Sequence, residues 1–339
     1  MFDTKYTILP AMLQLFAGDL QTNVTTDGGL TKEMKTFYDK TLIRLAEPEL
    51  VHDQFGQKRP IPKNGGKTIE FRKYTPLAKQ LTELTEGVTP DGQKLTVTTI
   101  EATVKQYGGY ITLSDQLLLT AIDNNLLEAI TLLSSQAART SDTITREVLV
   151  AGTNVQYAEG QVDGRASLAY TSEEDNMNLT VRGVRMATRT LKSQNAKKIG
   201  STFVGIIHPD VSFDLMSDPE WKYPHQYKDT SNLYAEEIGE VGGVRFVETT
   251  EAKKFVNAGA SSRDVYATMI LGANAYGVTE VTGGGLQTIV KQLGSAGTAD
   301  PLNQRATAGW KLMKTAVRLV EEYMVRVETT SSVNDHVDN

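Results

Sequence analysis

The sequence of 339 residues contains no cysteine. Disulfide bonds, thiolate nucleophiles and cysteine-based zinc sites are therefore excluded. A protein that has to be robust without disulfides needs another source of strength, and a large interface between subunits is one such source.

Long apolar runs and an excess of basic residues are missing as well. No stretch reaches the roughly 18 consecutive apolar residues that a membrane helix needs, and residues 1–28 lack the apolar core of a secretory signal. The formal net charge is -6 at pH 7, which argues against a protein whose main task is to grip nucleic-acid phosphates. We expect no membrane partner, and only weak, non-specific contact with nucleic acid.

Recognisable catalytic motifs are also absent. The four histidines, His52, His208, His225 and His336, have no partner at metal-ligand spacing, and no GxSxG nucleophile elbow occurs. Gly65-Gly66-Lys67-Thr68 lacks the earlier glycine and the following helix of a phosphate-binding loop. We expect no catalytic residue, no metal site and no cofactor, so the chain is predicted not to be an enzyme. An α/β enzyme with an unrecognised site remains an alternative of another class.

The clearest element that is present is a long helix over residues 123–150. Its rise predicts a rod of about 38 Å, which is long for a compact domain and typical of a structural spine. Apolar residues recur along it at spacings of three and four, which predicts one buried face. These spine residues are Leu126, Ile130, Leu133, Ala137, Ile144 and Val148.

Two segments before this helix have no core of their own. Residues 1–66 are broken up by glycines and by Pro60-Ile61-Pro62, which predicts an extended arm with short helices. Residues 67–106 have the pattern of a two-stranded ribbon, because residues 68–72 alternate apolar and polar side chains and a threonine-rich strand follows near residues 95–104. Turn signals at residues 89–92 lie between the two strands.

We expect the ribbon to end in a polar tip with no apolar set large enough to pack on its own subunit. Because an isolated ribbon is marginal in water, the tip is predicted to lie on a neighbouring subunit and to pair with it through charges. These are Lys79, Glu83, Glu86, Asp91 and Lys94.

A second helix is predicted from about Leu179 to Gln194, followed by strands at residues 203–207, 244–247 and 265–271. Strands that alternate with helices indicate a mixed α/β domain. A basic stripe recurs along this helix at spacings of three and four. We interpret it as a solvated face, with contact to DNA phosphates or to an acidic neighbouring subunit as the alternative. The stripe consists of Arg182, Arg185, Arg189 and Lys192.

Strand character returns near residues 288–290 and 324–327. Between them, the apolar residues from Trp310 to Val320 fit either one helical face or a hairpin that turns at Glu321-Glu322, and periodicity does not decide between the two. The polar tail, residues 331–339, is expected to be frayed.

Several segments stand in an order that resembles the major capsid proteins of tailed bacteriophages, typified by the coliphage N-four group. The resemblance covers about residues 60–330, with residues 304–311 the most specific part, and residues 1–59 carry none of it. The segments are Gly66-Lys67-Thr68-Ile69-Glu70-Phe71, Tyr107-Gly108-Gly109-Tyr110-Ile111, Gln136-Ala137-Ala138-Arg139, Asp300-Pro301-Leu302-Asn303-Gln304-Arg305 and Gly309-Trp310-Lys311.

The resemblance implies an α+β fold of the Hong Kong phage type. Such a fold has an N-terminal arm, an extended two-stranded loop, a peripheral domain with a long spine helix and an axial α/β domain. Its expected segments are the arm at 1–66, the extended loop at 67–106, the peripheral domain with the spine helix at 107–152, the axial domain at 153–285, peripheral return strands at 286–330 and a C-terminal tail at 331–339.

The resemblance also implies a function in assembly. A major capsid protein forms hexamers and pentamers that tile an icosahedral shell around double-stranded DNA, with scaffold, portal and decoration proteins as further partners. It is located in the virion and assembles in the host bacterial cytoplasm. The arm lacks a long charged coiled-coil pattern, so we expect no fused scaffold segment. The alternative within the same fold is an encapsulin-type compartment shell, which holds cargo enzymes.

Overall fold

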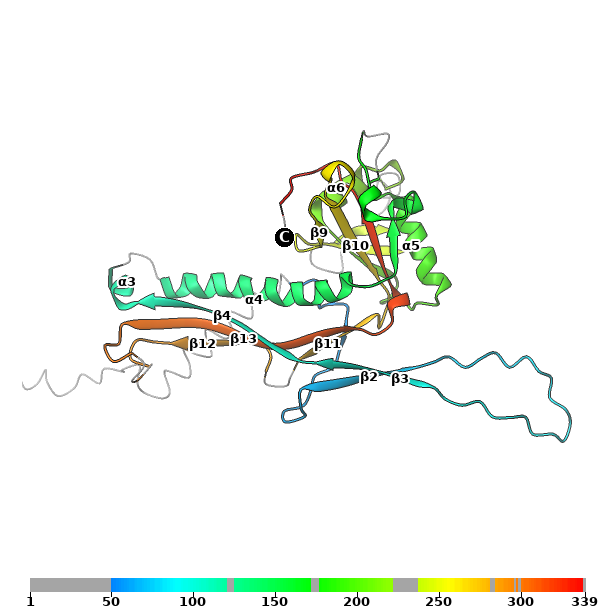
Figure 1. Cartoon of the computed structure of the whole chain (residues 1–339), viewed down its shortest axis with the longest axis horizontal. Coiled ribbons are helices and arrows are strands. Elements are labelled where there is room, and N and C mark those ends of the chain that lie inside the picture. Colours follow the sequence, from blue (N-terminus) through cyan, green and yellow to red (C-terminus); the bar gives the residue numbers. More distant parts are fainter. Residues whose placement is uncertain are drawn as a thin grey trace, which may run out of the picture.

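The structure is a computed structural model that describes residues 50–120, 125–171, 177–221, 237–280, 284–295, 297 and 300–337. The chain has two bodies joined at one end of a long helix, and a two-stranded ribbon projects beyond them (Figure 1). Most of the predicted arm, residues 1–49, lies outside the described part.

The helix–sheet body consists of helix α4 (Asn125–Val150) lying lengthwise on a five-stranded sheet (Figure 1). Its longest strand, β13, pairs antiparallel with β4 along one edge and with β12 and β11 along the other, while β1 runs parallel to β11. A short helix, α3 (Asp115–Thr120), follows β4. The strands are β1 (Gln57–Lys58), β4 (Lys105–Ser114), β11 (Tyr276–Glu280), β12 (Gln287–Lys291) and β13 (Arg305–Arg318).

Apolar side chains of α4 pack on β13. The Trp310 indole N–H donates to Gln136 Oε1 over 3.0 Å. A Cβ at Gly109 would lie 2.6 Å from that same oxygen, so glycine there lets the helix approach the sheet closely. The shared apolar cluster contains Ile130, Leu133, Ala137, Ala308, Trp310 and Leu312, with Leu126 at its margin.

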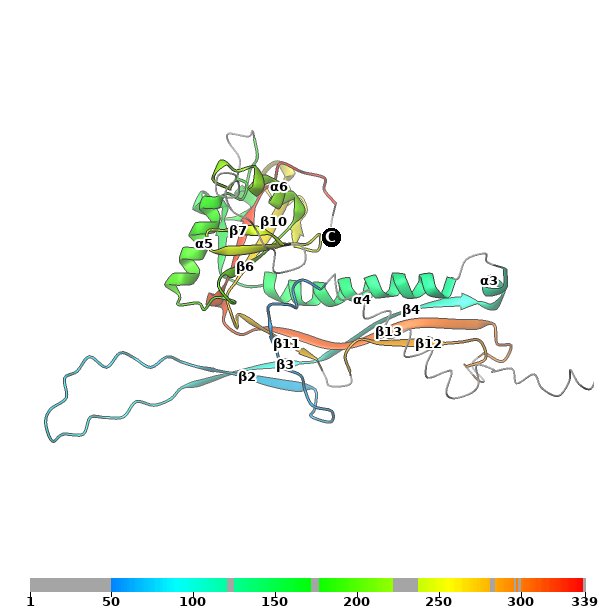
Figure 2. The same ribbon diagram turned by 180° about the vertical axis from the view of Figure 1, so that it is seen from behind.

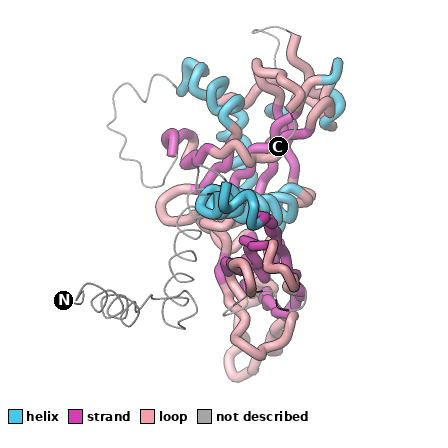
Figure 3. The backbone as a smooth tube through the Cα atoms, turned by 90° about the vertical axis from the view of Figure 1, so that its left-hand side faces the viewer, coloured by secondary structure: helices cyan, strands magenta, loops and turns pink. Residues whose placement is uncertain are grey.

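The predicted helix is confirmed, but in its second half the residues that were predicted to face the core are not the buried ones. Ile144 and Val148 are only half-buried, whereas Ser141, Thr145 and Leu149 are buried. The reason is that α4 passes from the sheet into the region between the two bodies, where other elements cover a different face. Figure 3 shows α4 end-on, with the five-stranded sheet below it and the second body above.

Two apolar positions on α4 give a matched test of this packing. Ile130→Ala is expected to lower the free energy of unfolding by about 3 kcal/mol, because the shortened side chain leaves a cavity. Ile130 is 1% exposed, whereas Leu132 is 65% exposed. The control Leu132→Ala should therefore change stability by less than about 0.5 kcal/mol. Chemical unfolding measures both losses, and equal values would contradict the assigned face.

The second body is a seven-stranded mixed sheet with helices α5 (Val181–Ser193) and α6 (Pro209–Ser217). Both helices share one core with the sheet, in which Val184 and Leu215 belong to the same cluster as Phe246. The strand order is β5-β14-β10-β6-β8-β7, with β9 beside β10. The strands are β5 (Val155–Tyr157), β6 (Phe203–Ile207), β7 (Glu237–Val241), β8 (Val244–Glu248), β9 (Lys254–Phe255), β10 (Val265–Leu271) and β14 (Met324–Thr329). Short 3-10 turns lie at Ala158–Gly160, Arg165–Ser167, Ala260–Ser262 and Glu321–Tyr323.

The C-terminal strands correct three sequence expectations. Residues 305–318 form one strand rather than a helical face, and β13 does not form a hairpin with β14. Instead β14 pairs with β10 and β5, so the predicted return strands at 286–330 divide between the two bodies. Conversely β11, predicted in the axial segment, pairs with β13. The apolar pattern was ambiguous because β13 has apolar residues in both alternation phases: Trp310 and Leu312 are buried, whereas Met313 and Val317 in the other phase are half-buried.

The C-terminal tail corrects a fourth expectation, because residues 331–337 are docked rather than frayed. The Ser332 N–H and hydroxyl donate to Asp214 on α6, over 2.9 and 2.5 Å. The His336 N–H donates to Asp264 over 2.9 Å. We call residues 331–337 the C-terminal strap. Its polar groups, which suggested a frayed end, are the groups that fix it to the second body.

Candidate functional site

The extended ribbon is formed by β2 (Thr68–Tyr74) and β3 (Val97–Thr103), which pair antiparallel in continuous register. It projects away from both bodies and ends in a long loop (Figures 1 and 2). Its root is anchored, because Phe71 is buried and a Cβ at Gly277 would lie 2.8 Å from the Phe71 ring. The ribbon is therefore held at one end only.

All residues from 75 to 96 are exposed, and this segment includes the five predicted charges. Among the described residues, no ion pair involves Lys79, Glu83, Glu86, Asp91 or Lys94. The tip does not pack on its own subunit, as expected, but it is not purely polar. It exposes five large apolar side chains, which are Leu77 (54%), Leu81 (84%), Leu84 (73%), Val88 (62%) and Leu95 (65%). We call these five the apolar row.

The apolar row matters because of its size and its isolation. Single exposed leucines are normal on a protein surface, but five apolar side chains on one projecting loop form a surface suited to contact with another molecule. Full burial of one leucine contributes about 1.5–3 kcal/mol, whereas one surface ion pair contributes about 0–1 kcal/mol. The apolar row therefore outweighs the charges as a source of binding energy.

The end of the arm, from residue 50 to 58, is inserted where the two bodies meet. Val51 and Phe55 are buried in a core cluster that also contains Leu149 of α4, Tyr276 of β11 and Met269 of β10. This cluster joins the helix–sheet body to the seven-stranded sheet, and we call it the junction. The arm was predicted to have no core of its own, and its described end belongs to a core that other segments build.

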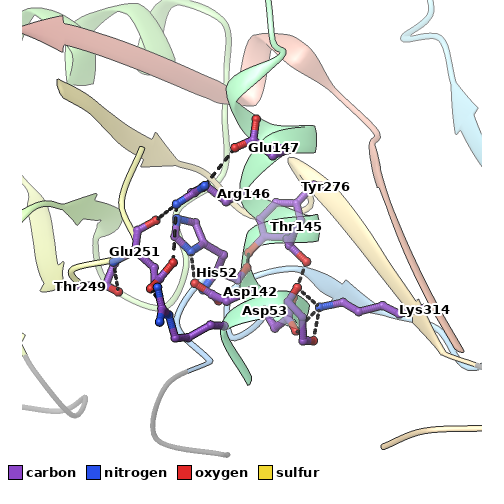
Figure 4. Close-up of polar contacts among 12 residues, drawn as sticks. His52, Asp53, Asp142, Thr145, Arg146, Glu147, Thr249, Glu251, Tyr276 and Lys314 are labelled. Carbon is purple, nitrogen blue, oxygen red and sulfur yellow. Dashed lines mark hydrogen bonds and ion pairs between the residues drawn. The ribbon is translucent and has the colours of Figure 1, made fainter. Parts of the chain in front are cut away.

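A buried ion pair lies beside the junction (Figure 4). Lys314 of β13 is fully buried, and its Nζ donates to the Asp53 carboxylate and to the Ser141 carbonyl and hydroxyl, the latter two over 2.8 Å. The Thr145 hydroxyl donates to the other Asp53 oxygen over 2.5 Å. All three donors of the Lys314 amine are thus satisfied, which is what a buried charge requires.

A second polar pair lies next to the first. His52 donates its backbone N–H to Asp142 Oδ1 over 2.7 Å, and its Nδ1 lies 2.5 Å from Asp142 Oδ2. Both side chains are buried, and the Tyr276 hydroxyl donates to the His52 carbonyl. Figure 4 shows these groups beside Arg146, whose guanidinium donates to the Glu251 carbonyl over 2.7 Å. The network ties the arm, α4 and the second body together.

The sequence did not reveal this network. Its members lie up to 261 positions apart, as in the Lys314–Asp53 bond, and no local spacing connects them. The one available signal was the polar residue Ser141 in the otherwise apolar face of the predicted spine. That residue accepts a hydrogen bond from Lys314.

The basic stripe of α5 is exposed along its whole length. Arg182, Arg185, Arg189 and Lys192 are all exposed, and a hollow of about 430 Å³ is lined by the last three. Arg185 pairs with Glu220 over 2.8 Å. No described acidic residue pairs with Arg189 or Lys192. The structure therefore leaves a basic helix face directed away from its own core.

The described histidines have structural partners. Burial lowers the pKa of the His208 imidazole, against the opposing influence of Asp210, and its Nδ1 accepts the Asp210 N–H at the start of α6. His336 bonds to Asp264, and His225 lies outside the described residues. Within the described ranges, no group of three histidine or acidic side chains could hold a metal ion. Over the same ranges, no helix is both long and apolar enough to cross a membrane.

Known proteins share this architecture. A family model described as phage capsid protein matches residues 97–329, whereas no curated protein matches the sequence. The solved capsid of Ralstonia phage GP4 superposes with a TM-score of 0.66 at 13% identity, over 84% of this chain and 89% of that chain. The cyanophage Pam1 capsid gives a TM-score of 0.63 at 14% sequence identity, over 85% of this chain and 93% of that chain. The mature capsid of bacteriophage PhiM1 gives a TM-score of 0.56 at 15% sequence identity, over 82% of this chain and 86% of that chain.

Proposed function

This chain belongs to the phage capsid protein family and has the Hong Kong phage-type α+β fold, and we propose that it tiles an icosahedral shell as hexamers and pentamers. The shell encloses double-stranded DNA. Scaffold, portal and decoration proteins are further partners, and assembly takes place in the host bacterial cytoplasm. The protein acts by binding copies of itself and needs no catalytic residue.

The observation that carries the proposal is the extended loop. Its apolar row is exposed, and Leu81 and Leu84 are 84% and 73% accessible in the isolated subunit. A ribbon held only at its root gains little stability from its own hydrogen bonds. Burial against a second copy supplies what the single subunit lacks, and the closed symmetry of a shell repeats that contact at every subunit.

The size of the native protein tests the proposal. Sedimentation and electron microscopy of the purified protein are expected to show megadalton particles, or hexamers and pentamers that convert to particles when concentrated. The physical reason is that many modest contacts reinforce one another in a closed shell. A chain that stays monomeric at every salt and protein concentration, even with its scaffold partner present, would exclude the proposal.

The encapsulin-type compartment shell is the second candidate, since it shares the fold. The match of residues 97–329 to a family model described as phage capsid protein favours the phage shell, and the net charge of -6 is compatible with a wall that holds nucleic acid without binding it tightly. Particles isolated from the native source separate the two candidates. DNA-filled particles with a portal at one vertex support the phage shell, and particles filled with an enzyme support the compartment.

A further inference from the structure

The two lateral edges of the second body differ in charge. Helix α5 lies at one edge, and the C-terminal strap runs along the opposite edge, as Figures 1 and 2 agree. The α5 edge exposes the basic stripe, in which Arg189 and Lys192 have no partner among the described acidic residues. From residue 177 to residue 209 the sequence contains no aspartate or glutamate. Glu220 pairs with Arg185 at this edge, and Arg189 and Lys192 still leave the edge basic.

The strap edge is acidic. Its carboxylates come from α6, from the sheet and from the strap itself. Lys254 is the one lysine or arginine that pairs with any of them among the described residues, and it is buried between Asp264, at 3.4 Å, and Asp335. The carboxylates of this edge are the exposed Asp335, the half-buried Asp210, Asp214 and Glu248, and the buried Asp264. Five acidic groups against one lysine leave a negative surplus.

The titration of the Tyr266 hydroxyl at this edge agrees with that surplus. Burial, the hydrogen bond to Asp210 and the charges of Asp335 and Asp264 together raise the pKa of the Tyr266 hydroxyl. The Lys254 bond lowers the pKa of Asp335, so that carboxylate stays ionised near neutral pH. The Asp335 side chain is 49% exposed, and the strap also exposes Val333 (38%) and Val337 (62%). The edge is thus open to a partner.

The position of the extended loop indicates which partner meets the basic edge. The loop projects from the body on the same side as α5 (Figures 1 and 2). A second copy that receives the loop therefore lies beside α5 as well. In a ring of identical subunits, each interface joins two different surfaces of the subunit, so opposite edges have to be complementary.

We propose that the basic face of α5 in one copy binds the acidic strap edge of the next copy around each hexamer or pentamer. This inference rests on the proposed shell function and names the contact that closes its rings. Opposite charge on opposite edges favours head-to-tail pairing, and like charges oppose pairing of two identical edges. The C-terminal strap is then a part of the interface, and its docking on α6 positions Asp335 for that contact.

Charge reversal tests the contact. Arg189→Glu with Lys192→Glu places acids opposite acids, and shell yield at physiological salt is expected to fall at least about tenfold. Val333→Lys with Val337→Lys adds two positive charges to the strap without removing any described hydrogen bond, and it should fail in the same way. A chain that carries all four substitutions restores opposite charges and should assemble again.

Lys197→Glu with Lys198→Glu is the matched control, because it changes the net charge by the same amount just beyond the end of α5. It should assemble like the unmodified chain, and unaltered melting of every variant checks the fold. The inference is overturned if the α5 variant assembles normally, or if the fourfold variant does not recover while the control assembles. It is also overturned if the α5 variant forms normal shells that lose only duplex DNA, since DNA is then the partner. Failure of the unmodified chain to form any particle refutes the proposed function instead.

Discussion

Deletion of residues 79–92, with the remaining ends of the loop joined by a short turn, is expected to abolish shell formation while both bodies stay folded. None of the buried core residues lies in the deleted segment, so the core clusters remain complete. The deletion removes Leu81, Leu84 and Val88 from the apolar row. Burial of each side chain of this size contributes about 1.5–3 kcal/mol of binding free energy. Because the loss occurs at every subunit contact of a closed shell, the modest contacts elsewhere are not sufficient to replace it.

Two full-length variants separate the causes. Leu81→Ser with Leu84→Ser removes apolar surface and keeps the loop length, and it should reproduce most of the deletion effect. Lys79→Gln with Glu83→Gln removes two of the predicted charges, and it should weaken shells only slightly, because a surface ion pair contributes about 0–1 kcal/mol. Melting of the subunits and electron microscopy of the products are the measurements. Shells of normal size and stability from the deletion variant would show that the loop does not bridge subunits.

Asp53→Ala is expected to destabilise the subunit by about 3–5 kcal/mol, because it leaves the Lys314 amine buried without its carboxylate. Lys314 is fully buried and Asp53 is 7% exposed, so water cannot readily replace the lost partner. The effect should extend beyond the helix–sheet body. Asp53 lies between Val51 and Phe55, which are part of the junction that holds the two bodies together.

A double-mutant cycle distinguishes a broken pair from a simple loss of packing. Lys314→Met keeps most of the side-chain volume, and Asp53→Ala combined with Lys314→Met should cost clearly less than the sum of the single changes, because no charge is left unpaired. Lys311→Met on the same strand is the control, since Lys311 is only half-buried and has no ion pair among the described residues. If chemical unfolding shows that the losses in unfolding free energy of the two single variants add up to that of the double variant, the two residues are not a coupled pair.

The sequence by itself determined the elements with strong local signals. The 26-residue helix α4 followed from a sustained spacing of three and four. The ribbon followed from alternation around a turn-rich tip, and the basic stripe at spacings of three and four lies on the predicted helix that the structure shows as α5. The order of these elements was also sufficient to indicate the family, because the order of elements along the chain is contained in the sequence and does not depend on how the elements pack.

Only the tertiary structure decided how the elements combine. The Lys314–Asp53 and His52–Asp142 pairs join residues that no periodicity relates. The assignment of β14 to the seven-stranded sheet depended on hydrogen-bonding partners rather than on composition.

The apolar row of the extended loop was hidden for a different reason. A leucine in a sequence does not report whether its own subunit covers it, and Leu81 and Leu84 lie between polar residues that suggested a purely polar tip. Burial and pairing are properties of two surfaces at once, and local pattern describes only one of them. For the same reason the opposite charges of the two edges became visible only when the fold placed α5 and the C-terminal strap on opposite sides of one body.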